Sequence, residues 1–259
     1  MAEPHAVRPV AQETDIEPLL YPCNKLDLGA PLRWLKLGWH DMRRAMHQSM
    51  IYGAGLTLFS YLVLALAWTE GNTVVLFTLA IAFILMGPVL AFGLYSISRQ
   101  IEQGREPRLG VCLLESRNHL RNELLFALVM LVVLLVWARA ASMVHVFFPV
   151  GEELGVIGWL QFLAVGSAVG SIFATIVFSA SVVSLPMMLD RGTDAITSAL
   201  TSVNAVINNK GVMLLWAVMI VSLVAIGFAT LLMGLVIVLP LIGHATWHAY
   251  RETVKPAEK

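Results

Sequence analysis

The sequence predicts an all-α polytopic membrane protein, a helical bundle with about six transmembrane helices arranged as three hairpins. Apolar residues make up 58% of the chain, charged residues only 13%, and the mean hydropathy is +0.77. Soluble domains are roughly half apolar and about one quarter charged. In addition, the apolar residues form long runs, and the basic residues fall between alternate runs. A polytopic membrane protein has both properties.

The chain begins with a polar, proline-containing stretch. We expect residues 1–28 to form a disordered cytoplasmic arm, because no basic segment leads into a short apolar stretch with a cleavage site. Residues 29–253 then form the membrane domain, and residues 254–259 a short tail.

Each crossing helix needs about 20 mostly apolar residues. The predicted spans lie at about 50–68, 73–97, 124–148, 158–185, 211–227 and 230–250. The last two share one run, residues 211–250, which contains no Asp, Glu, Lys or Arg. As a single straight helix this run would be roughly 60 Å long, about twice the hydrocarbon thickness. We therefore predict a hairpin here; a single crossing, giving five in all, is the alternative.

The distribution of basic residues favours six crossings. With six, all but one of the 17 Lys and Arg residues lie on one side of the membrane, which is typical of the cytoplasmic side. Both termini would then be cytoplasmic, whereas five crossings would place the basic tail outside. The zero net charge gives no indication of nucleic-acid binding.

An amphipathic stretch precedes each hairpin. These stretches are "PLRWLKLGWHDMRRAMHQ", "LGVCLLESRNHLRNEL" and "TDAITSALTSVNAVINN". Their apolar residues recur at spacings of three, four and seven, as in a helix that lies in the membrane interface. In the first stretch the apolar stripe comprises Leu32, Leu35, Trp39, Met42 and Met46.

A proline lies near the cytoplasmic half of each hairpin's second helix. Pro88, Pro186 and Pro240 are predicted to break these helices, because proline lacks the backbone N–H. An arginine follows each proline, 11 residues later for Pro88 and for Pro240. We interpret this as a three-fold internal repeat of an interfacial helix, a helix and a proline-broken helix.

Arg139 is the only basic residue inside a predicted span. An ionisable side chain within the membrane is by default a candidate functional residue. Because Arg139 lies past the midpoint of its span, we expect it to reach the outer headgroups or Glu152 and Glu153. Contact with a substrate or ion is the alternative.

Small residues recur at four-residue spacing in the fourth predicted span. Gly166, Gly170 and Ala174 form a predicted packing face. We expect this face to pack inside the bundle; contact with a second copy or with another membrane protein is the alternative.

The motif "GHATWHAYR" places His244 and His248 one helical turn apart. Their imidazoles could converge on one metal ion or haem, but no HExxH motif or cysteine pair accompanies them. We favour polar anchoring and hydrogen bonding at the cytoplasmic interface and keep cofactor binding by this pair as the weaker alternative.

Cys23 and Cys112 are read as free thiols. The sequence contains no catalytic motif, metal cluster or cofactor motif, so we expect no enzyme activity.

Four motifs resemble those of a family of uncharacterised bacterial integral membrane proteins. They are "LGWHDMRRA", "GPVLAFGLYSISRQIEQGREP", "SLPMMLDRGTDAITSALTSVNAVINN" and "LPLIGHATWHAYR". Some family members carry an automatic label of cytochrome c oxidase subunit I. The resemblance implies a bacterial inner-membrane protein and supplies no catalytic residues. The label does not fit the chain as a whole, because an oxidase core subunit needs six histidine ligands on a scaffold of about twelve helices.

These observations together favour a non-catalytic scaffold or accessory protein of the bacterial inner membrane, in association with a respiratory complex. Its expected partners are the lipid bilayer and either another membrane protein or a second copy. A small transporter or channel is the first alternative, and a haem- or metal-binding membrane protein the second.

Overall fold

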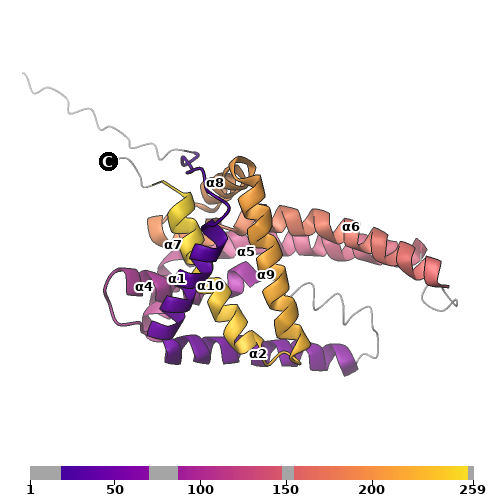
Figure 1. Ribbon diagram of the computed structural model, residues 1–259, viewed down its shortest axis with the longest axis horizontal. Helices are drawn as coiled ribbons and strands as arrows, with labels where there is room; N and C mark the ends of the chain where they lie inside the picture. Colours follow the sequence, from indigo (N-terminus) through magenta and orange to yellow (C-terminus); the bar gives the residue numbers. More distant parts are fainter. Residues whose placement is uncertain (1–18, 70–86, 148–154, 256–259) are drawn as a thin grey trace, which may run out of the picture.

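The computed structural model describes residues 19–69, 87–147 and 155–255, without the side chains at 66–68, 111, 113–120 and 145–147. Within these ranges the protein is helical, and its only β-type pairing is an isolated antiparallel bridge between Cys23 and Val254. The helices, shown in Figure 1, are α1 (Ala30–Arg44), α2 (Met46–Thr69), α4 (Phe92–Glu102), α5 (Leu109–Phe147), α6 (Val156–Ser181), α7 (Ser184–Arg191), α8 (Ala195–Asn208), α9 (Lys210–Ala229) and α10 (Leu235–Thr253).

Four described segments are long and apolar enough to cross a membrane. They are Met46–Ala65, Arg121–Val144, Val156–Arg191 and Lys210–Ala229. The predicted span 73–97 lies mostly outside the described residues. The predicted span 230–250 corresponds to most of α10, which is not among the four segments.

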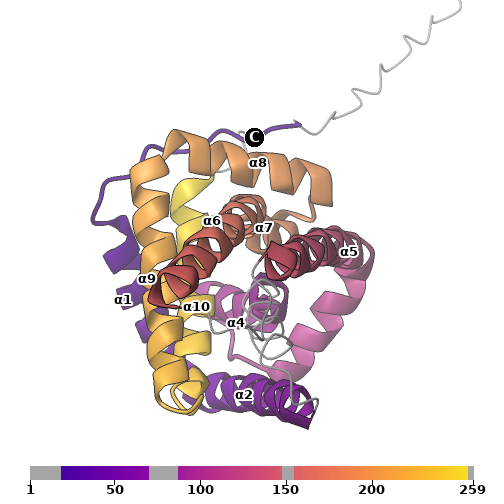
Figure 2. The ribbon, with the colours of Figure 1, turned by 90° about the vertical axis from the view of Figure 1, so that its right-hand side faces the viewer.

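The long helices do not all run in one direction. Figure 1 shows α2, α5 and α6 along the long axis of the molecule, with α9 running across them. Figure 2, turned by 90°, agrees, because α2 and α6 point toward the viewer while α9 lies across the view. The structure therefore does not confirm the predicted arrangement of six transmembrane helices in three hairpins. It does divide the apolar run 211–250 into α9 and α10, separated by turns at residues 230–234.

The amphipathic stretches take two forms. The first and third are the separate helices α1 and α8. The second is continuous with the following span, because α5 is one helix of 39 residues. Figure 2 shows that the first turns of α5 run across the direction of the remainder. The expectation of a separate interfacial helix is therefore wrong for this stretch.

The helix α8 has a well-defined start. The Asp194 carboxylate accepts hydrogen bonds from the backbone N–H groups of Ile196 (2.8 Å) and Thr197 (3.0 Å), as in a typical N-cap. Hydrogen bonding from Thr197 above all keeps the pKa of Asp194 below its usual value. Just before it, Gly192 ends α7 with a φ of 69°, a conformation that glycine adopts without strain.

The three prolines differ in their effect on the helices. The helix break after Pro88 lies at Ala91, and the break near Pro186 precedes it, at residues 182–183. Pro186 is then in the first turn of α7, where its missing N–H costs no hydrogen bond. In contrast, Pro240 lies inside the continuous helix α10. The prediction of a break at Pro240 is therefore wrong.

The helix α10 tolerates Pro240 because α2 packs closely beside it. Proline at 240 leaves the carbonyl of Val236, four residues earlier, without its helical partner. Gly53 of α2 is so near this carbonyl that a Cβ at position 53 would be 2.1 Å from the Val236 oxygen. Only a glycine fits there, and the hydrogens on its Cα face the freed carbonyl.

The helix α10 is the centre of the packing. A Cβ on Gly38 of α1 would be 2.6 Å from the backbone nitrogen of Ala245, and a Cβ on Gly243 would be 2.5 Å from the side chain of Leu94 in α4. Glycines thus allow three helices, α1, α2 and α4, to approach α10 closely. The aromatic core continues beside them with Trp34 and Trp216, whose rings meet edge to face at 5.5 Å.

The described segments nearest the two ends of the chain, at residues 22–24 and 253–255, lie together. The backbone N–H of Asn24 donates to Thr253 O (2.8 Å), and that of Lys255 donates to Pro22 O (3.0 Å). Leu26 N also donates to Asn209 Oδ1 (2.9 Å). Residues 21–28 are therefore ordered against the C-terminal segment, which corrects the expectation of a disordered arm over 1–28; residues 1–18 lie outside the described part.

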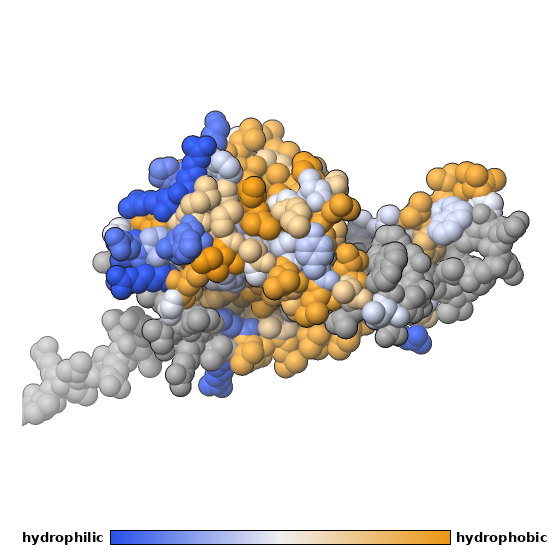
Figure 3. Space-filling view, turned by 90° about the horizontal axis from the view of Figure 1, so that it is seen from below, coloured by the Kyte–Doolittle hydropathy of each residue, from blue (hydrophilic) through white to orange (hydrophobic). Residues whose placement is uncertain are grey.

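Polar and apolar surfaces are separated along the molecule. Figure 3 shows hydrophilic residues concentrated at the end that carries α1 and α4, while most of the coloured surface in the rest of this view is hydrophobic. On the distal parts of α5 and α6, many large apolar side chains are exposed, among them Leu128, Leu135, Leu160 and Ile172. Such extensive apolar surface is expected where acyl chains or another membrane protein cover it.

Candidate functional site

The two histidines of "GHATWHAYR" face helices α1, α2 and α4. His244 is completely buried, and His248 is mostly buried, with 19% of its side chain exposed. Around them the structure collects Asp41 from α1, Ser49 from α2 and Ser98 from α4. We call these five residues the polar network.

Both ring nitrogens of His244 have protein partners. Its Nε2 is 2.9 Å from Ser49 Oγ, and its Nδ1 is 2.8 Å from Ser98 Oγ. Both serines are buried as well. Buried polar groups are costly unless they are hydrogen-bonded, so these two contacts account for the presence of an imidazole in the interior.

Asp41 connects the two histidines. Its Oδ2 accepts a hydrogen bond from Ser98 Oγ (2.8 Å) and lies 2.8 Å from His248 Nε2. Asp41 is only 5% exposed. A buried carboxylate is stabilised by such hydrogen bonds, and the second one is charge-assisted when His248 is protonated.

The number of protons that each group can donate determines which atom is the donor in each hydrogen bond of the polar network. Ser98 has one hydroxyl proton, which it donates to Asp41, so it must accept from His244 Nδ1–H. The neutral His244 ring then accepts at Nε2 from the hydroxyl of Ser49. Every contact is thereby satisfied with a neutral His244 and an ionised Asp41.

This arrangement leaves His244 without a free nitrogen for a ligand. A metal or haem iron needs an unoccupied imidazole nitrogen. In the described part of the chain, no group of three or more His, Cys, Asp or Glu side chains could hold a metal ion. The expectation of anchoring at the cytoplasmic interface also needs correction for His244, which lies in the protein interior and hydrogen-bonds there.

A second set of polar residues joins the ends of α4, α7 and α10. At its centre, Asp190 Oδ2 accepts from Tyr250 Oη (2.6 Å) and pairs with Arg251 (3.1 Å), while Arg99 Nε lies 3.9 Å from Oδ1. Tyr250 in turn accepts from Arg191 Nε (2.9 Å). The arginines that follow Pro88, Pro186 and Pro240 are thus brought together in space.

Glu102 extends this cluster toward α10. It pairs with Arg251 at 2.7 Å and accepts from Trp247 Nε1 at 2.9 Å. The guanidinium of Arg191 lies 4.8 Å from the centre of the Tyr21 ring, so the N-terminal segment also contacts it. We call Arg99, Glu102, Asp190, Arg191, Tyr250 and Arg251 the exit cluster.

A third polar contact fixes the chain ends. Arg33 pairs with Asp27 (2.6 Å) and Glu252 (2.5 Å), and Trp34 Nε1 donates to Glu252 Oε2 (2.7 Å). The hydrogen bonds from Arg33 lower the pKa of Asp27 to about 2. The Asp27 carboxylate is therefore charged at neutral pH.

The other predicted site residues lie apart from these clusters. Arg139 is exposed on α5, and its expected partners Glu152 and Glu153 lie outside the described residues. An added Cβ at Gly166 or Gly170 would meet no described atom within 4 Å, and Ala174 is exposed. In the described structure these residues of α6 therefore make no close helix contact.

Three members of the polar network, Asp41, Ser49 and Ser98, were not identified from the sequence. One signal was available for Asp41. Asp41 follows Trp34 by seven residues and Gly38 by three, so the three residues share one face of α1, and the structure shows that this face is buried. The predicted apolar stripe coincides with this face only in part, because Met42 is buried whereas Leu32 is 57% and Met46 45% exposed. An acidic residue in line with a tryptophan and a glycine indicates a buried polar contact.

Two hollows in the described surface are separate from the histidines. One, of about 410 Å³, is lined by Gln100, Arg105, Glu106 and Arg108. The other, of about 430 Å³, lies along α2 at Tyr61, Leu64, Ala65 and Thr69. Neither is lined by a residue of the polar network.

Comparison with known proteins identifies a family for the middle of the chain. Residues 75–190 match the family described as "Predicted integral membrane protein (DUF2189)". No curated protein and no solved structure matches the chain. The matched segment contains Ser98 and Asp190 but neither histidine. Residues 75–190 are therefore similar to a family of predicted integral membrane proteins of unknown function, the class that the sequence motifs resemble.

Proposed function

We propose that this protein is a non-catalytic scaffold or accessory protein of the bacterial inner membrane. The observation that carries the proposal is the polar network, in which His244 uses both ring nitrogens to join α10 to α2 and α4. Asp41 and His248 add α1 to the same network. The residues of the polar network, whose side chains would be the best suited to catalysis or ligand binding, thus hold helices together.

The partner surface in this proposal is the pair formed by α5 and α6. Figure 1 shows both helices extending beyond the remaining helices as an arm, and many large apolar side chains are exposed on it. Exposed apolar residues on this arm suit lipid and the apolar face of another membrane protein equally well. Association with a respiratory complex is our proposal for that partner.

Both termini are proposed to lie in the cytoplasm. Support comes from the hydrogen bonds between residues 22–24 and 253–255, which require both segments to be on the same side of the membrane. An even number of crossings satisfies this requirement, and five do not. The concentration of arginines in the exit cluster, at the same end, favours the cytoplasmic side.

The internal repeat also remains a proposal, and the exit cluster supports it. If three similar units had diverged from one, their corresponding arginines would be equivalent positions. Arg99, Arg191 and Arg251 meet around Asp190 and Tyr250. The repeated helix end would then serve to tie the units together.

Purification from the native host tests the scaffold proposal. We expect the tagged full chain, extracted in mild detergent, to retain a larger membrane complex. Gly166→Leu combined with Gly170→Leu fills a face that has room for side chains and should release the partner. Ala54→Leu with Gly55→Leu, at exposed positions of α2 outside this partner surface, is the matched control. A monodisperse chain without any partner would contradict the proposal.

A second candidate, proton-linked transport, is favoured by one observation. The polar network is a continuous chain of groups that can both donate and accept protons, from the partly exposed His248 to the buried Ser49. Transport proteins use such chains as proton relays. We expect reconstituted protein to show no proton flux; a flux that Asp41→Asn abolishes would instead favour the transporter.

A further inference from the structure

A group of basic side chains gathers where α1 meets α2 and where α4 meets α5. Arg43 and Arg44 end α1, and His47 follows in the first turn of α2. Arg105 and Arg108 lie in the segment between α4 and α5. All five side chains are exposed. We call them the basic patch.

Two contacts hold these segments side by side. Gln48 Nε2 donates to Pro107 O at 2.9 Å, so the residues flanking each partner are neighbours. Ala45, between the α1 arginines and His47, packs in one buried cluster with Ile101 and Cys112. The basic patch is therefore one continuous surface.

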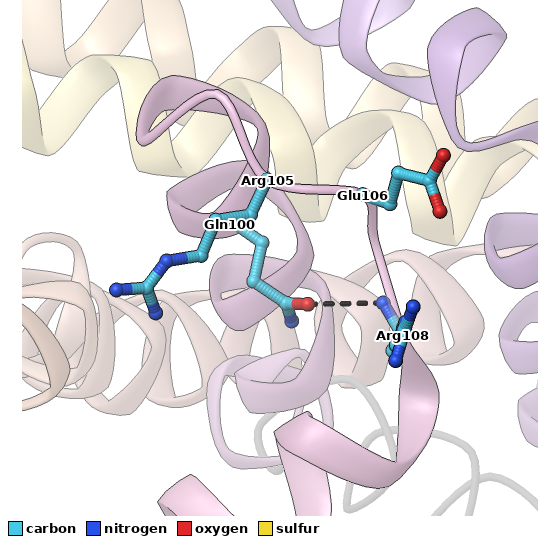
Figure 4. Close-up of a pocket in the computed structure, with 4 residues that line it drawn as sticks. All are labelled: Gln100, Arg105, Glu106 and Arg108. Carbon is cyan, nitrogen blue, oxygen red and sulfur yellow. Dashed lines mark hydrogen bonds between the residues drawn. The ribbon is translucent and has the colours of Figure 1, made fainter.

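The patch contrasts with the paired arginines at the chain ends and in the exit cluster. Arg33 and Arg251 are each held by two carboxylates. Among the described residues, no ion pair joins any member of the basic patch to a carboxylate. The nearest acidic side chain along the chain is Glu106, and Figure 4 shows it pointing to the opposite side from Arg105. The positive charge of the patch is thus available to an external anion.

The structure also provides a hollow within the patch. Gln100, which is buried, accepts at its Oε1 a hydrogen bond of 2.9 Å from the backbone N–H of Arg108 and so fixes the turn before α5. Arg105, Arg108 and the carboxylate residue Glu106 line the resulting hollow of about 410 Å³ together with Gln100 (Figure 4). Its size suits a phosphate-containing headgroup.

Apolar residues beside the patch identify the source of that anion. Trp39 is 38% exposed and carries the Arg43 guanidinium 5.0 Å from its ring centre, and Met46 is 45% exposed. The apolar segment Met46–Ala65 begins at the same place. Exposed tryptophan with arginines at the start of a span is the composition of a membrane interface, where basic side chains attract anionic lipids.

We propose that the basic patch binds the phosphate headgroups of anionic phospholipids in the cytoplasmic leaflet. The ligand chemistry is a phosphate anion attached to a diacylglycerol, recognised by Arg105 and Arg108 in the hollow and by Arg43 and Arg44 beside Trp39. This site is separate from the polar network and from the partner surface on α5 and α6.

The test titrates the purified full chain in neutral detergent with phosphatidylglycerol and follows bound lipid by native mass spectrometry. We expect tighter binding of phosphatidylglycerol than of phosphatidylcholine. Replacing Arg105 and Arg108 together by Gln should weaken phosphatidylglycerol binding by roughly fivefold for each arginine, and Arg43→Gln with Arg44→Gln should act similarly. All four side chains are exposed, so the variants should fold, which gel filtration checks.

Lys25→Gln with Lys210→Gln is the matched control, because it removes the same charge from positions outside the patch. This control should bind lipid as the unaltered protein does. Equal weakening in the control would show unspecific attraction and overturn the proposal. Inorganic phosphate at millimolar concentration should not displace the lipid; complete displacement would indicate a small-anion site and also overturn it.

Discussion

At the scale of single residues, the polar network explains how an imidazole, a carboxylate and two hydroxyls coexist in the interior of this protein. Each donor has an acceptor, and Asp41 Oδ2 serves both Ser98 and His248. Such networks stabilise when they are complete and are costly when one member is removed. The contribution of the polar network to the free energy of unfolding can therefore be measured by removing one of its hydroxyl groups.

Ser98→Ala should destabilise the protein by about 1–3 kcal/mol, because it leaves the buried Nδ1 of His244 without a partner and removes one of the two hydrogen bonds to Asp41 Oδ2. The measurement is the unfolding transition in mild detergent. Ser142→Ala is the matched control, since that exposed hydroxyl donates only to the carbonyl of Ala138 in its own helix. If both variants unfold alike, the network contributes nothing to stability.

At the scale of helices, close packing around α10 depends on glycines at particular places. Gly38, Gly53 and Gly243 each lie where a side chain would meet a neighbouring helix. The glycines of α6 selected from the sequence pattern have no such neighbour among the described residues. Spacing alone identifies small residues, whereas the helix that approaches them depends on the tertiary structure.

Gly53→Ala should destabilise the pairing of α2 with α10 by about 1–3 kcal/mol, because the new Cβ would overlap the Val236 carbonyl. Gly55→Ala, two residues further along the same helix, meets nothing within 4 Å and should leave stability unchanged or slightly higher. Thermal unfolding of the two variants compares them directly. An equal effect of both would contradict the close approach.

The sequence predicts the class of the fold more fully than its arrangement. Composition and apolar runs identify an all-helical membrane protein, and the length of the run 211–250 predicts its division into two helices. The direction of α9 relative to α2 could not be predicted in this way. It depends on the contacts of α10, and the residues that make these contacts are far apart in the sequence. Likewise, His244 and His248 stand out as a motif, but Asp41 and Ser98 join them only after folding.

At the scale of the whole molecule, the pairing of the chain ends determines the topology. Cys23 and Val254 face each other across an isolated antiparallel bridge. The exit cluster, with the Arg33 pairs, holds the same region together. The polar end of the protein is thus closed by the paired segments 22–24 and 253–255, and the apolar helices extend from it.

Val254→Cys should form a disulfide with Cys23 under mild oxidation, because opposed residues of an antiparallel pair are within bridging distance. Non-reducing electrophoresis after proteolysis between the two positions detects the link. Lys255→Cys, one residue further, should form much less of it. Failure of Val254→Cys to react in intact membranes would contradict the location of both ends on one side.

The most direct test of the role of α10 is the absorption spectrum of the purified full chain, together with its metal content. If His244 and His248 fasten α10 to its neighbours, the protein will show no Soret band and no stoichiometric metal. His244→Gln should then lower stability without changing the spectrum. A Soret band or bound metal that disappears in His244→Gln would contradict a structural role for the histidines and establish a cofactor site in its place.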